Sequence, residues 1–341
     1  MNARKILSVI IPTHNMECYL EHTLSSLLVD KYLDSLEVIV VNDGSTDNSL
    51  AIARRFHDLY PDVFVVIDKS NGHYGSCVNA GLKVAVGKYI KVLDADDSFD
   101  TDNLSIMLGL LNKLEVDLMI THFVTISPEG ERGKPRRLHL PANRILDIKD
   151  VYRTMGKKGT WMHELAYRRS IFNEIDYHQS EGILYSDMQW GMVPMSRVRT
   201  LYYLNKIVYL YLMGRTGQSM DTNIHKQHLA DEYHVLLEIV KAYGQVDFCC
   251  AETRKMLYYK LYRRLCWSYR ECMITYDDRH AKPLLEFDNS LRNANRELYG
   301  WLNRRLLSVP LIPVPFIKLW RNNPDGWLLR MALLVYKMLH R

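Results

Sequence analysis

Short apolar segments alternate with amphipathic stretches over the first hundred residues of the chain. The apolar segments, rich in Val and Ile, are ILSVII (6–11), LEVIVV (36–41), VFVVI (63–67) and KYIKVL (88–93). Between them, residues 17–29, 48–59 and 76–86 carry apolar side chains at helical spacing. Strands that alternate with helices predict an α/β fold, with a Rossmann-like, mostly parallel sheet and flanking helices.

The pattern is less regular past residue 115. VDLMITHFVTI (116–126) predicts one strand, and LYYLNKIVYLYLMG (201–214) predicts one or two. From about residue 225 the chain reads as helices, interrupted near Gly244, Asp277 and the Pro-rich segment 308–316. We therefore expect a domain over residues 1–220, made of a nucleotide-binding half (1–115) and an acceptor half (116–220), and a helical C-terminal region over 221–341.

Polar turns follow three of the predicted strands, at the edge where parallel sheets bind ligands. One of them, VLDADDSFD (92–100), places Asp94, Asp96, Asp97 and Asp100 within seven positions. Carboxylates this close raise one another's pKa and repel. The segment therefore predicts a bound cation, a turn open to water, or both, and Asp100 is expected to be only solvated.

Three kinds of nucleotide or metal site do not fit the motifs. A dehydrogenase would place GxGxxG directly after the first strand, where residues 12–15 read PTHN, and no GxxxxGK[ST] occurs. An EF-hand counted from Asp94 would put Phe99 where Gly is needed and Ser105 where a bidentate Glu is needed. An Asp-x-Asp pair at a strand end remains, and it can bind Mg²⁺ or Mn²⁺ beside a diphosphate.

Composition and charge restrict the setting. With 48% hydrophobic and 24% charged residues the chain is typical of a globular protein. Its first apolar run is too short for a signal peptide, and no run reaches the ~18 apolar residues of a membrane span. The six cysteines lack CxxC spacing, so we expect reduced thiols and a cytoplasmic protein.

The positive charge is concentrated at the C-terminal end. Residues 301–341 hold seven Lys or Arg and one acidic residue, Asp325, which gives a net charge of +6. The whole chain carries +5, so the rest of the sequence sums to −1. GWLLRMALLVYKMLHR (326–341) combines apolar helical spacing with Arg330, Lys337 and Arg341. This pattern predicts peripheral contact with an anionic membrane surface on the inner face; the alternative is a helix packed on its own domain. No nucleic-acid recognition motif occurs.

Four segments in order resemble the glycosyltransferase family 2 enzymes of the GT-A fold. They are SVIIPTHNMECYLEHTLSSLL, EVIVVNDGSTDNSLAIA, NAGLKVAVGKYIKVLDADD and LYSDMQW, within about residues 6–220. The resemblance implies a metal-dependent hexosyltransferase with a DXD motif, which uses Mn²⁺ or Mg²⁺. It further implies inverting transfer of one sugar from a nucleotide donor, a UDP-sugar, to a hydroxyl of a glycan or lipid-linked glycan in cell-surface polysaccharide synthesis.

The same resemblance assigns donor binding to two turns. The first is the loop after the first strand, with Pro12, Thr13 and Asn15, and the second contains Asp43 in NDGSTD. An Asp at this place can accept the imide N–H of uracil. The alternative for NDGSTD is a helix N-cap in which Ser45 or Thr46 caps the next helix.

In DADD the resemblance implies that Asp94 and Ala95 lie beside the donor and that Asp96, with Asp94, binds the metal. Asp97 is a further candidate. In NGHYGSCVNAGL the family commonly has an Arg before the Asn, whereas here Val78 precedes the expected donor residue Asn79. A missing cation there makes His73, Lys83 or a later basic residue a candidate substitute; His73 is equally explained as a surface residue.

Asp187 in SDMQW is expected to be the catalytic base, with Ser186 where the family usually has Glu. An inverting transfer needs a base that takes the acceptor proton, and a carboxylate suits that role. The alternative is that Ser186 or Asp187 caps a helix running to residue 197. WMHELAYRRS adds Trp161, His163 and Glu164 as candidates for the acceptor site, although a core Trp is the simpler explanation.

YLYLMGRTGQSM resembles the segment that closes over the donor phosphates in the family. Arg215 could pair with the diphosphate, and Gln218 and Ser219 could donate hydrogen bonds. A surface loop with one Arg is the alternative. Two competing functions also stay open: a nucleotidyltransferase, which would want a Gly-rich basic loop where PTHNMECYL stands, and a non-catalytic sugar-nucleotide-binding homologue, suggested by Val78 and Ser186.

Overall fold

The computed structural model describes residues 5–215, 218, 221–309 and 312–339. The chain forms two compact units. Unit 1 comprises Met1–Gln218 and Val246–Arg254, and unit 2 comprises Ser219–Gln245 and Lys255–Arg341. The segment 246–254 therefore returns to unit 1 after the chain has entered unit 2.

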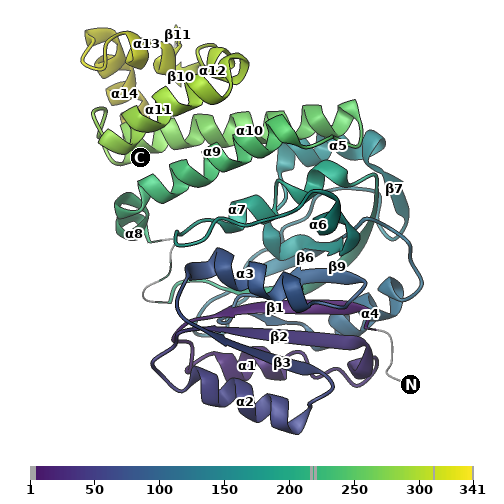
Figure 1. Ribbon diagram of the computed structural model, residues 1–341. Helices are drawn as coiled ribbons and strands as arrows, with labels where there is room; N and C mark the ends of the chain where they lie inside the picture. Colours follow the sequence, from purple (N-terminus) through teal and green to yellow (C-terminus); the bar gives the residue numbers. More distant parts are fainter. Residues whose placement is uncertain (1–4, 216–217, 219–220, 310–311, 340–341) are drawn as a thin grey trace. The chain divides into compact units, whose positions relative to one another are not determined.

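Unit 1 is built on a single mixed sheet, with strand order β3-β2-β1-β4-β8-β6-β9-β5 and β7 paired to β9 (Figure 1). Its four predicted N-terminal strands are confirmed as β1 (Leu7–Thr13), β2 (Leu36–Asp43), β3 (Phe64–Lys69) and β4 (Tyr89–Val92), all paired in parallel. The other strands are β5 (Ser98–Phe99), β6 (Leu118–Ile126), β7 (Ile145–Asp147), β8 (Leu165–Arg168) and β9 (Thr200–Leu212). The predicted α/β class is confirmed.

Alternate side chains of β1 pack against different helices, because successive residues of a strand point to opposite faces. Leu7, Val9 and Ile11 belong to one core cluster with side chains of α1 (Leu20–Ser25), α2 (Ser49–Leu59) and α4 (Thr101–Leu111). Ile10 instead lies against Gly81 of α3 (His73–Val84), where an added Cβ would come within 2.6 Å of its side chain. Burial on both faces explains why β1 and β2 are predominantly apolar.

Residues 116–220 hold three helices, α5 (Ile148–Lys158), α6 (Ser170–Glu174) and α7 (Asp187–Trp190). The same segment contains the 3₁₀ turns η2 (Met162–Glu164) and η3 (Pro194–Arg197), while the 3₁₀ turn η1 (Leu33–Ser35) precedes β2. The expected helix from Asp187 to residue 197 is wrong: α7 ends at Trp190, and Pro194 begins a separate turn because its ring cannot continue a helix.

Unit 2 is helical, as predicted. It holds α8 (Thr222–Gln227), α9 (Leu229–Gln245), most of α10 (Ala251–Arg270), the π-turn η4 (Glu271–Thr275), α11 (Lys282–Ala294), α12 (Arg296–Leu302), α13 (Phe316–Asn322) and α14 (Trp327–Leu339). A hairpin, β10 (Leu307–Val309) with β11 (Ile312–Val314), occupies the Pro-rich segment. Within the described ranges, no helix combines the length and the apolar character that a membrane crossing requires.

Candidate functional site

Asp43 ends β2 and is held by the loop that follows β3. Its Oδ1 accepts hydrogen bonds from Lys69 Nζ at 2.6 Å and from the backbone N–H of Gly72 at 2.9 Å. Lys69 Nζ also donates to Ser76 Oγ of α3 at 2.8 Å. The carboxylate is nearly buried, so its orientation is fixed by these donors. Lys69 was not singled out from the sequence, because it follows the predicted strand 63–67; in the structure it ends β3 and pairs in register with Asp43.

The turn after β1 is tied to the turn after β2. Asn15 adopts a left-handed backbone, φ 53°, and its Oδ1 accepts the backbone N–H of Thr46 at 2.8 Å. Its own N–H donates to Ser45 Oγ at 3.1 Å. Pro12 and Thr13 lie in β1 immediately before it, with the Thr13 side chain buried. Asn15 therefore joins the two turns to which donor binding was assigned.

The helix-cap alternative for Ser45 and Thr46 is wrong. Helix α2 begins at Ser49 with Asn48 at its N-cap, too far along the chain for either residue to cap it. Thr46 is bound through its backbone to Asn15 instead. The NDGSTD turn is thus organised by contacts to the loop after β1.

The second half of the DADD turn anchors it to β9. Asp97 Oδ2 accepts the hydroxyl of Tyr209 at 2.5 Å, and its Oδ1 accepts the backbone N–H of Leu212 at 2.7 Å. Burial, with the carboxylates of Asp94 and Asp96 in addition, raises the pKa of Asp97 well above its ordinary value. Asp100, expected to be only solvated, instead caps α4 by accepting the N–H of Asn103 at 3.0 Å.

Asp94 contacts a tyrosine from α3. Its Oδ1 accepts the hydroxyl of Tyr74 at 2.9 Å. The pKa of Asp94 is raised to about 7, first by burial and next by the charge of Asp96, with a smaller contribution from Asp187; the Tyr74 hydroxyl and Arg215 act in the opposite direction. Carboxylates that raise one another's pKa in this way favour a proton or a cation between them.

Asp96 pairs with Arg215 across the turn. Arg215 Nε lies 2.5 Å from Asp96 Oδ2, and the two side chains are 17% and 10% exposed. The guanidinium also stacks over Tyr19, 5.4 Å from the ring centroid. Ala95 between the two acids is buried, and its carbonyl accepts Thr23 Oγ1 at 2.9 Å. Arg215, expected to bind diphosphate, is therefore brought to the DXD turn.

Gln218 closes the loop that carries Arg215. Its Oε1 accepts the N–H of Gly214 at 2.8 Å, and its Nε2 donates to the carbonyl of Leu212 at 2.7 Å. These bonds connect the loop to the end of β9, which also holds Asp97. Ser219, expected to donate to the donor phosphates, lies outside the described residues.

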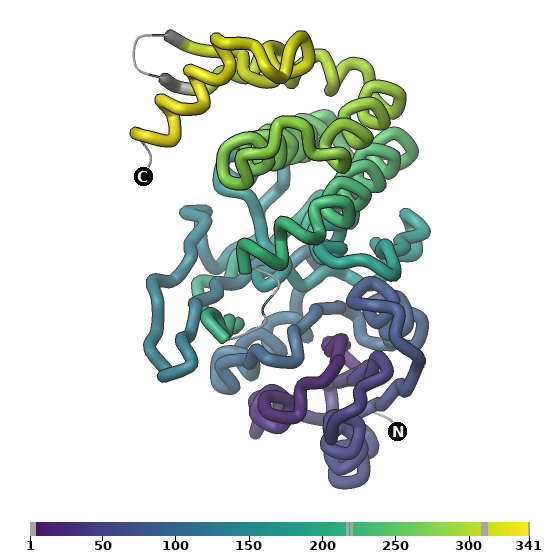
Figure 2. Tube along the Cα trace, turned by 90° about the vertical axis from the view of Figure 1, so that its left-hand side faces the viewer, coloured from purple at the N-terminus to yellow at the C-terminus, as the bar shows by residue number. Residues whose placement is uncertain are grey.

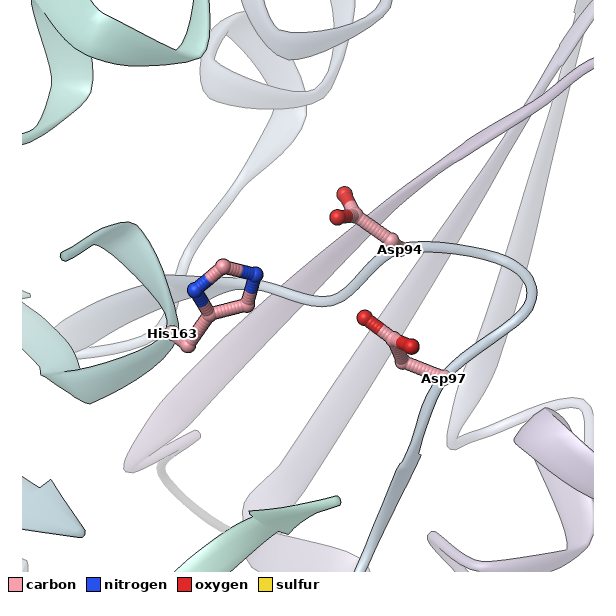
Figure 3. A group of neighbouring side chains, drawn as sticks. All are labelled: Asp94, Asp97 and His163. Carbon is pink, nitrogen blue, oxygen red and sulfur yellow. The ribbon is translucent and has the colours of Figure 1, made fainter. Parts of the chain in front are cut away.

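Asp94, Asp97 and His163 converge (Figure 3), with one ligand atom of each within 4.8 Å of the others. His163 comes from η2, is 6% exposed and stacks on Tyr211 at 4.6 Å. Burial, and next the charges of Lys91 and Arg136, lowers the pKa of its imidazole to about 3, so the ring is neutral. Across the part of the chain that the structure describes, its Nδ1 has no hydrogen-bond partner.

This donor set fits a divalent cation. A metal needs a neutral imidazole and deprotonated carboxylates, and its ligands lie about 2.0–2.2 Å from it, so a separation of 4.8 Å requires only a small inward shift. Mn²⁺ accepts both oxygen and nitrogen ligands, whereas Mg²⁺ prefers oxygen. Asp94 is common to this cluster and to the predicted pair Asp94 and Asp96.

Trp161 and Glu164 flank His163 but differ in exposure. Trp161 is 46% exposed, with Arg136 over its ring at 5.8 Å. Glu164 is fully buried; its Oε2 accepts Arg136 Nη1 at 2.6 Å and the N–H of Trp161 at 2.9 Å. Of the candidates for the acceptor site, Trp161 is exposed to solvent, whereas Glu164 is buried and stabilises the turn through its hydrogen bonds.

Asp187 begins α7, which packs against η2, the turn that carries His163. The charge of Asp187 raises the pKa of Asp94 and also that of Tyr74, after burial and the charge of Asp94. Ser186, in the place of the usual Glu, is the N-cap residue but its side chain makes no capping bond; it is buried and accepts Gln179 Nε2 at 3.2 Å. The cap explanation therefore fails for Ser186.

Asn79 connects α3 to the segment that leads to Asp187. Its Nδ2 donates to the carbonyl of Gln179 at 2.8 Å and to Glu181 Oε1 at 2.8 Å, and its Oδ1 accepts the N–H of Gln179 at 2.9 Å. Val78, at the place of the usual Arg, is fully buried. His73 is exposed at the start of α3, with φ 63°.

The site also contains residues that the sequence did not reveal, namely Lys69, Tyr74, Tyr209 and Tyr211. Tyr209 and Tyr211 are two apart in β9, and a strand period of two places them on one face. That spacing was the available signal. Tyr74 carries no comparable pattern, because its contact with Asp94 depends on how α3 packs.

Residues 8–176 match the family described as Glycosyl transferase family 2. The chain is 28% identical over 235 residues to the uncharacterized glycosyltransferase YibD of Escherichia coli K12, covering 67% of this chain and 66% of YibD. It is 32% identical over 143 residues to the minor teichoic acid biosynthesis protein GgaB of Bacillus subtilis, covering 41% of this chain and 16% of GgaB.

In structure the chain is similar to residues 1–349 of S. aureus TarS, solved in complex with UDP-GlcNAc. The TM-score is 0.72 at 19% identity, over 98% of this chain and 92% of that one. A match of this extent at low identity establishes the fold. The sequence match, the named relatives and the shared fold agree with the four motifs, and the chain belongs to glycosyl transferase family 2, with a GT-A fold.

Proposed function

We propose that the protein is a metal-dependent, inverting glycosyltransferase that moves one sugar from a UDP-sugar to a hydroxyl of a glycan. The observation that carries this proposal is that Asp187 begins α7, which packs against η2, the turn whose His163 converges with Asp94 and Asp97 at the ligand-binding edge of a GT-A sheet. In this proposal Asp187 serves the acceptor, and Asp94 and Asp96 serve the donor. The similarity to GgaB supports a role in cell-surface polysaccharide synthesis, and the acceptor is then a glycan or a lipid-linked glycan.

Asp43 would bind the nucleobase. Lys69 and Gly72 occupy Oδ1 and fix the carboxylate plane, so the carboxylate is preorganised to accept the imide N–H of uracil. Pro12, Thr13 and Asn15 shape the adjoining wall through the joined turns. The TarS complex with UDP-GlcNAc supports a uridine donor for a related fold.

Asp94 and Asp96 would hold Mn²⁺ or Mg²⁺, with His163 and Asp97 as additional ligands. When bound, the cation would neutralise charge on the departing diphosphate. Arg215 would supply a second positive charge to the same phosphates through a bidentate contact. A set with an imidazole nitrogen favours Mn²⁺ over Mg²⁺.

Asp187 would take the proton of the acceptor hydroxyl as its oxygen attacks the anomeric carbon. The new bond joins that oxygen to the carbon, the bond from the carbon to the diphosphate oxygen breaks with its electron pair, and UDP departs. One displacement inverts the anomeric centre. The exposed ring of Trp161 would stack on the acceptor sugar.

Incubation with a panel of UDP-sugars and Mn²⁺, followed by detection of released UDP, tests the function. We expect metal-dependent UDP release, and a transferred sugar of inverted configuration when an acceptor is present. Release of pyrophosphate in a separate incubation with UTP and a sugar 1-phosphate would identify a nucleotidyltransferase instead. Donor binding with no release under any condition would favour the non-catalytic sugar-nucleotide-binding alternative.

Asn79, His73, Gln218 and Ser219 stay predictions as donor contacts. The amide of Asn79 is engaged with residues 179–181, which favours a positioning role. A location on the cytoplasmic face of the membrane also stays a prediction. It would suit an enzyme that meets UDP-sugars in the cytoplasm and a lipid-linked acceptor at the bilayer.

A further inference from the structure

Helix α14 exposes a continuous apolar stripe at the border of unit 2, where it is the last yellow helix of the tube (Figure 2). Four side chains at spacings of four, three and four lie on one face of this helix, as helical geometry requires. These side chains are Trp327, Met331, Leu334 and Met338, which are 76%, 52%, 53% and 70% exposed, respectively. Leu328 and Leu339 widen the stripe, with 40% and 53% exposed.

The helix is nevertheless firmly seated. Leu329, Ala332 and Leu333 on its other face are buried, and α14 packs against α13, η4 and strand β10. Its core contacts are therefore complete without the stripe. Contiguous exposed apolar surface of this kind marks a contact with a partner or a membrane.

Positive charge borders the stripe. Arg330 and Lys337 lie on the flank of α14, paired with Asp325 at 2.5 Å and Asp277 at 2.9 Å. Arg304 and Arg305 are exposed immediately before β10, next to Leu306, which is 46% exposed. Strand β10, which follows them directly, packs on α14.

We propose that this face of unit 2, α14 with residues 304–306, docks on an anionic phospholipid surface. The stripe supplies large apolar side chains, including a Trp, and the flanking cations match lipid phosphates. A second copy of the chain fits less well, since residues 301–341 carry a net charge of +6 and would repel one another. The proposal does not depend on the transferase activity.

The helix would lie in the plane of the interface. Its 13 residues span about 20 Å at 1.5 Å per residue, against about 30 Å for a hydrocarbon core. Trp327, Met331, Leu334 and Met338 would enter the boundary between headgroups and acyl chains. Arg304 and Arg305 would stay at the phosphate level.

Flotation of the full-length protein with vesicles tests the proposal. We expect binding to vesicles of phosphatidylcholine with phosphatidylglycerol, weaker binding to phosphatidylcholine alone, and loss of binding at high salt. The double variant Met331→Asp, Leu334→Asp should lower partitioning by about tenfold or more, because it places two charges in the apolar stripe. Leu59→Asp, at a residue of α2 that is 64% exposed, is the matched control and should bind like the wild type.

Folding and self-association are checked on the same samples. Both substituted residues of α14 are more than half exposed, so the double variant should keep the wild-type circular dichroism spectrum and Tm. Arg304→Glu with Arg305→Glu, which leaves the stripe intact, should also weaken binding to anionic vesicles. Wild-type flotation of the Asp variants, equal binding to neutral vesicles, or a dimer that dissociates only in the Asp variants would each overturn the proposal.

Discussion

Arg215 Nε lies 2.5 Å from Asp96 Oδ2, so its guanidinium binds the carboxylate that the proposed function assigns to a cation. Asp96 and Arg215 are mostly buried, and a charge-assisted bond in such a place is strong. A cation on Asp96 would compete with Arg215 until a diphosphate offered the guanidinium another partner. Metal and nucleotide are therefore expected to bind cooperatively.

Arg215→Ala should separate these effects. Without its competitor, Mn²⁺ should bind the nucleotide-free protein more tightly, whereas UDP affinity with Mn²⁺ present should fall by about 1.5–3 kcal/mol, the range for a charged hydrogen bond. Calorimetric titrations with Mn²⁺ alone and then with UDP measure both. Arg54→Ala, at an exposed pair with Asp68, is the control. Unchanged Mn²⁺ affinity in Arg215→Ala would show that the ion pair does not occupy the metal site.

Asp96→Ala should abolish metal-dependent donor binding, because the proposed function makes Asp96 a ligand of the cation and the variant also loses the ion pair with Arg215. Thermal shift with a UDP-sugar, with and without Mn²⁺, measures the loss.

His163→Asn should weaken the binding of Mn²⁺ more than the binding of Mg²⁺, since only Mn²⁺ gains from a nitrogen ligand. Equal loss for the two ions would place His163 outside the coordination sphere.

Asp187→Asn should keep UDP-sugar and Mn²⁺ affinity but reduce kcat by about 10²–10⁴, the usual contribution of a general base. The amide preserves size while it loses the ability to accept a proton. Single-turnover transfer and donor titration on the same preparation provide the two readouts. Transfer at the wild-type rate would require another base.

The raised pKa of Asp94 predicts a pH-dependent difference in stability. Its value in the folded protein moves from 3.8 to about 7, so the metal-free fold binds this proton more tightly than the unfolded chain does. That stabilisation is present below 3.8 and is lost as the pH rises to about 7. Without metal, the Tm of Asp94→Asn minus the Tm of the wild type should therefore increase as the pH rises from about 3.8 to about 7, the two pKa values of Asp94. A constant difference across this window would contradict the assignment, and Mn²⁺ should remove the difference at the upper end.

Asn79→Ala should destabilise unit 1 by about 2–4 kcal/mol, because it removes three hydrogen bonds to residues 179–181 at about 1 kcal/mol each and leaves buried groups unpaired. Urea unfolding measures this. The same variant should lower kcat with little change in the KM for the donor if Asn79 positions the segment before Asp187. A large rise in donor KM with normal kcat would instead support direct donor contact. Asn112→Ala, at an exposed residue after the end of α4, is the control.

The N-terminal half of the fold follows from local pattern. Val and Ile runs, with an amphipathic helix between each pair, define β1 to β4, and the polar turns after them necessarily meet at one edge of the sheet. Asp43, Asp94 and Asp96 could be located on that basis. Val38 to Val41, buried throughout, show how directly such a run reads as a central strand.

The rest of the site depends on contacts between residues far apart in the sequence. His163 meets Asp97 only because β8, β6 and β9 follow β4 in the sheet, an order that no local pattern encodes. Arg215 meets Asp96 across 119 residues, and Tyr74 reaches Asp94 through the packing of α3. Ser186, a departure from the family pattern, is explained by its buried bond to Gln179.

Because the returning segment Val246–Arg254 belongs to unit 1, neither unit is encoded by one continuous stretch of the gene. Cys249 is held in unit 1 by its N–H to the carbonyl of Ser196 at 2.9 Å and by its Sγ to the carbonyl of Val198 at 3.0 Å. A gene fragment that stops at the end of β9 would lack this piece of unit 1. A single recombination event could not exchange one unit for another, so the transferase unit and its helical companion would have to be inherited, and engineered, together.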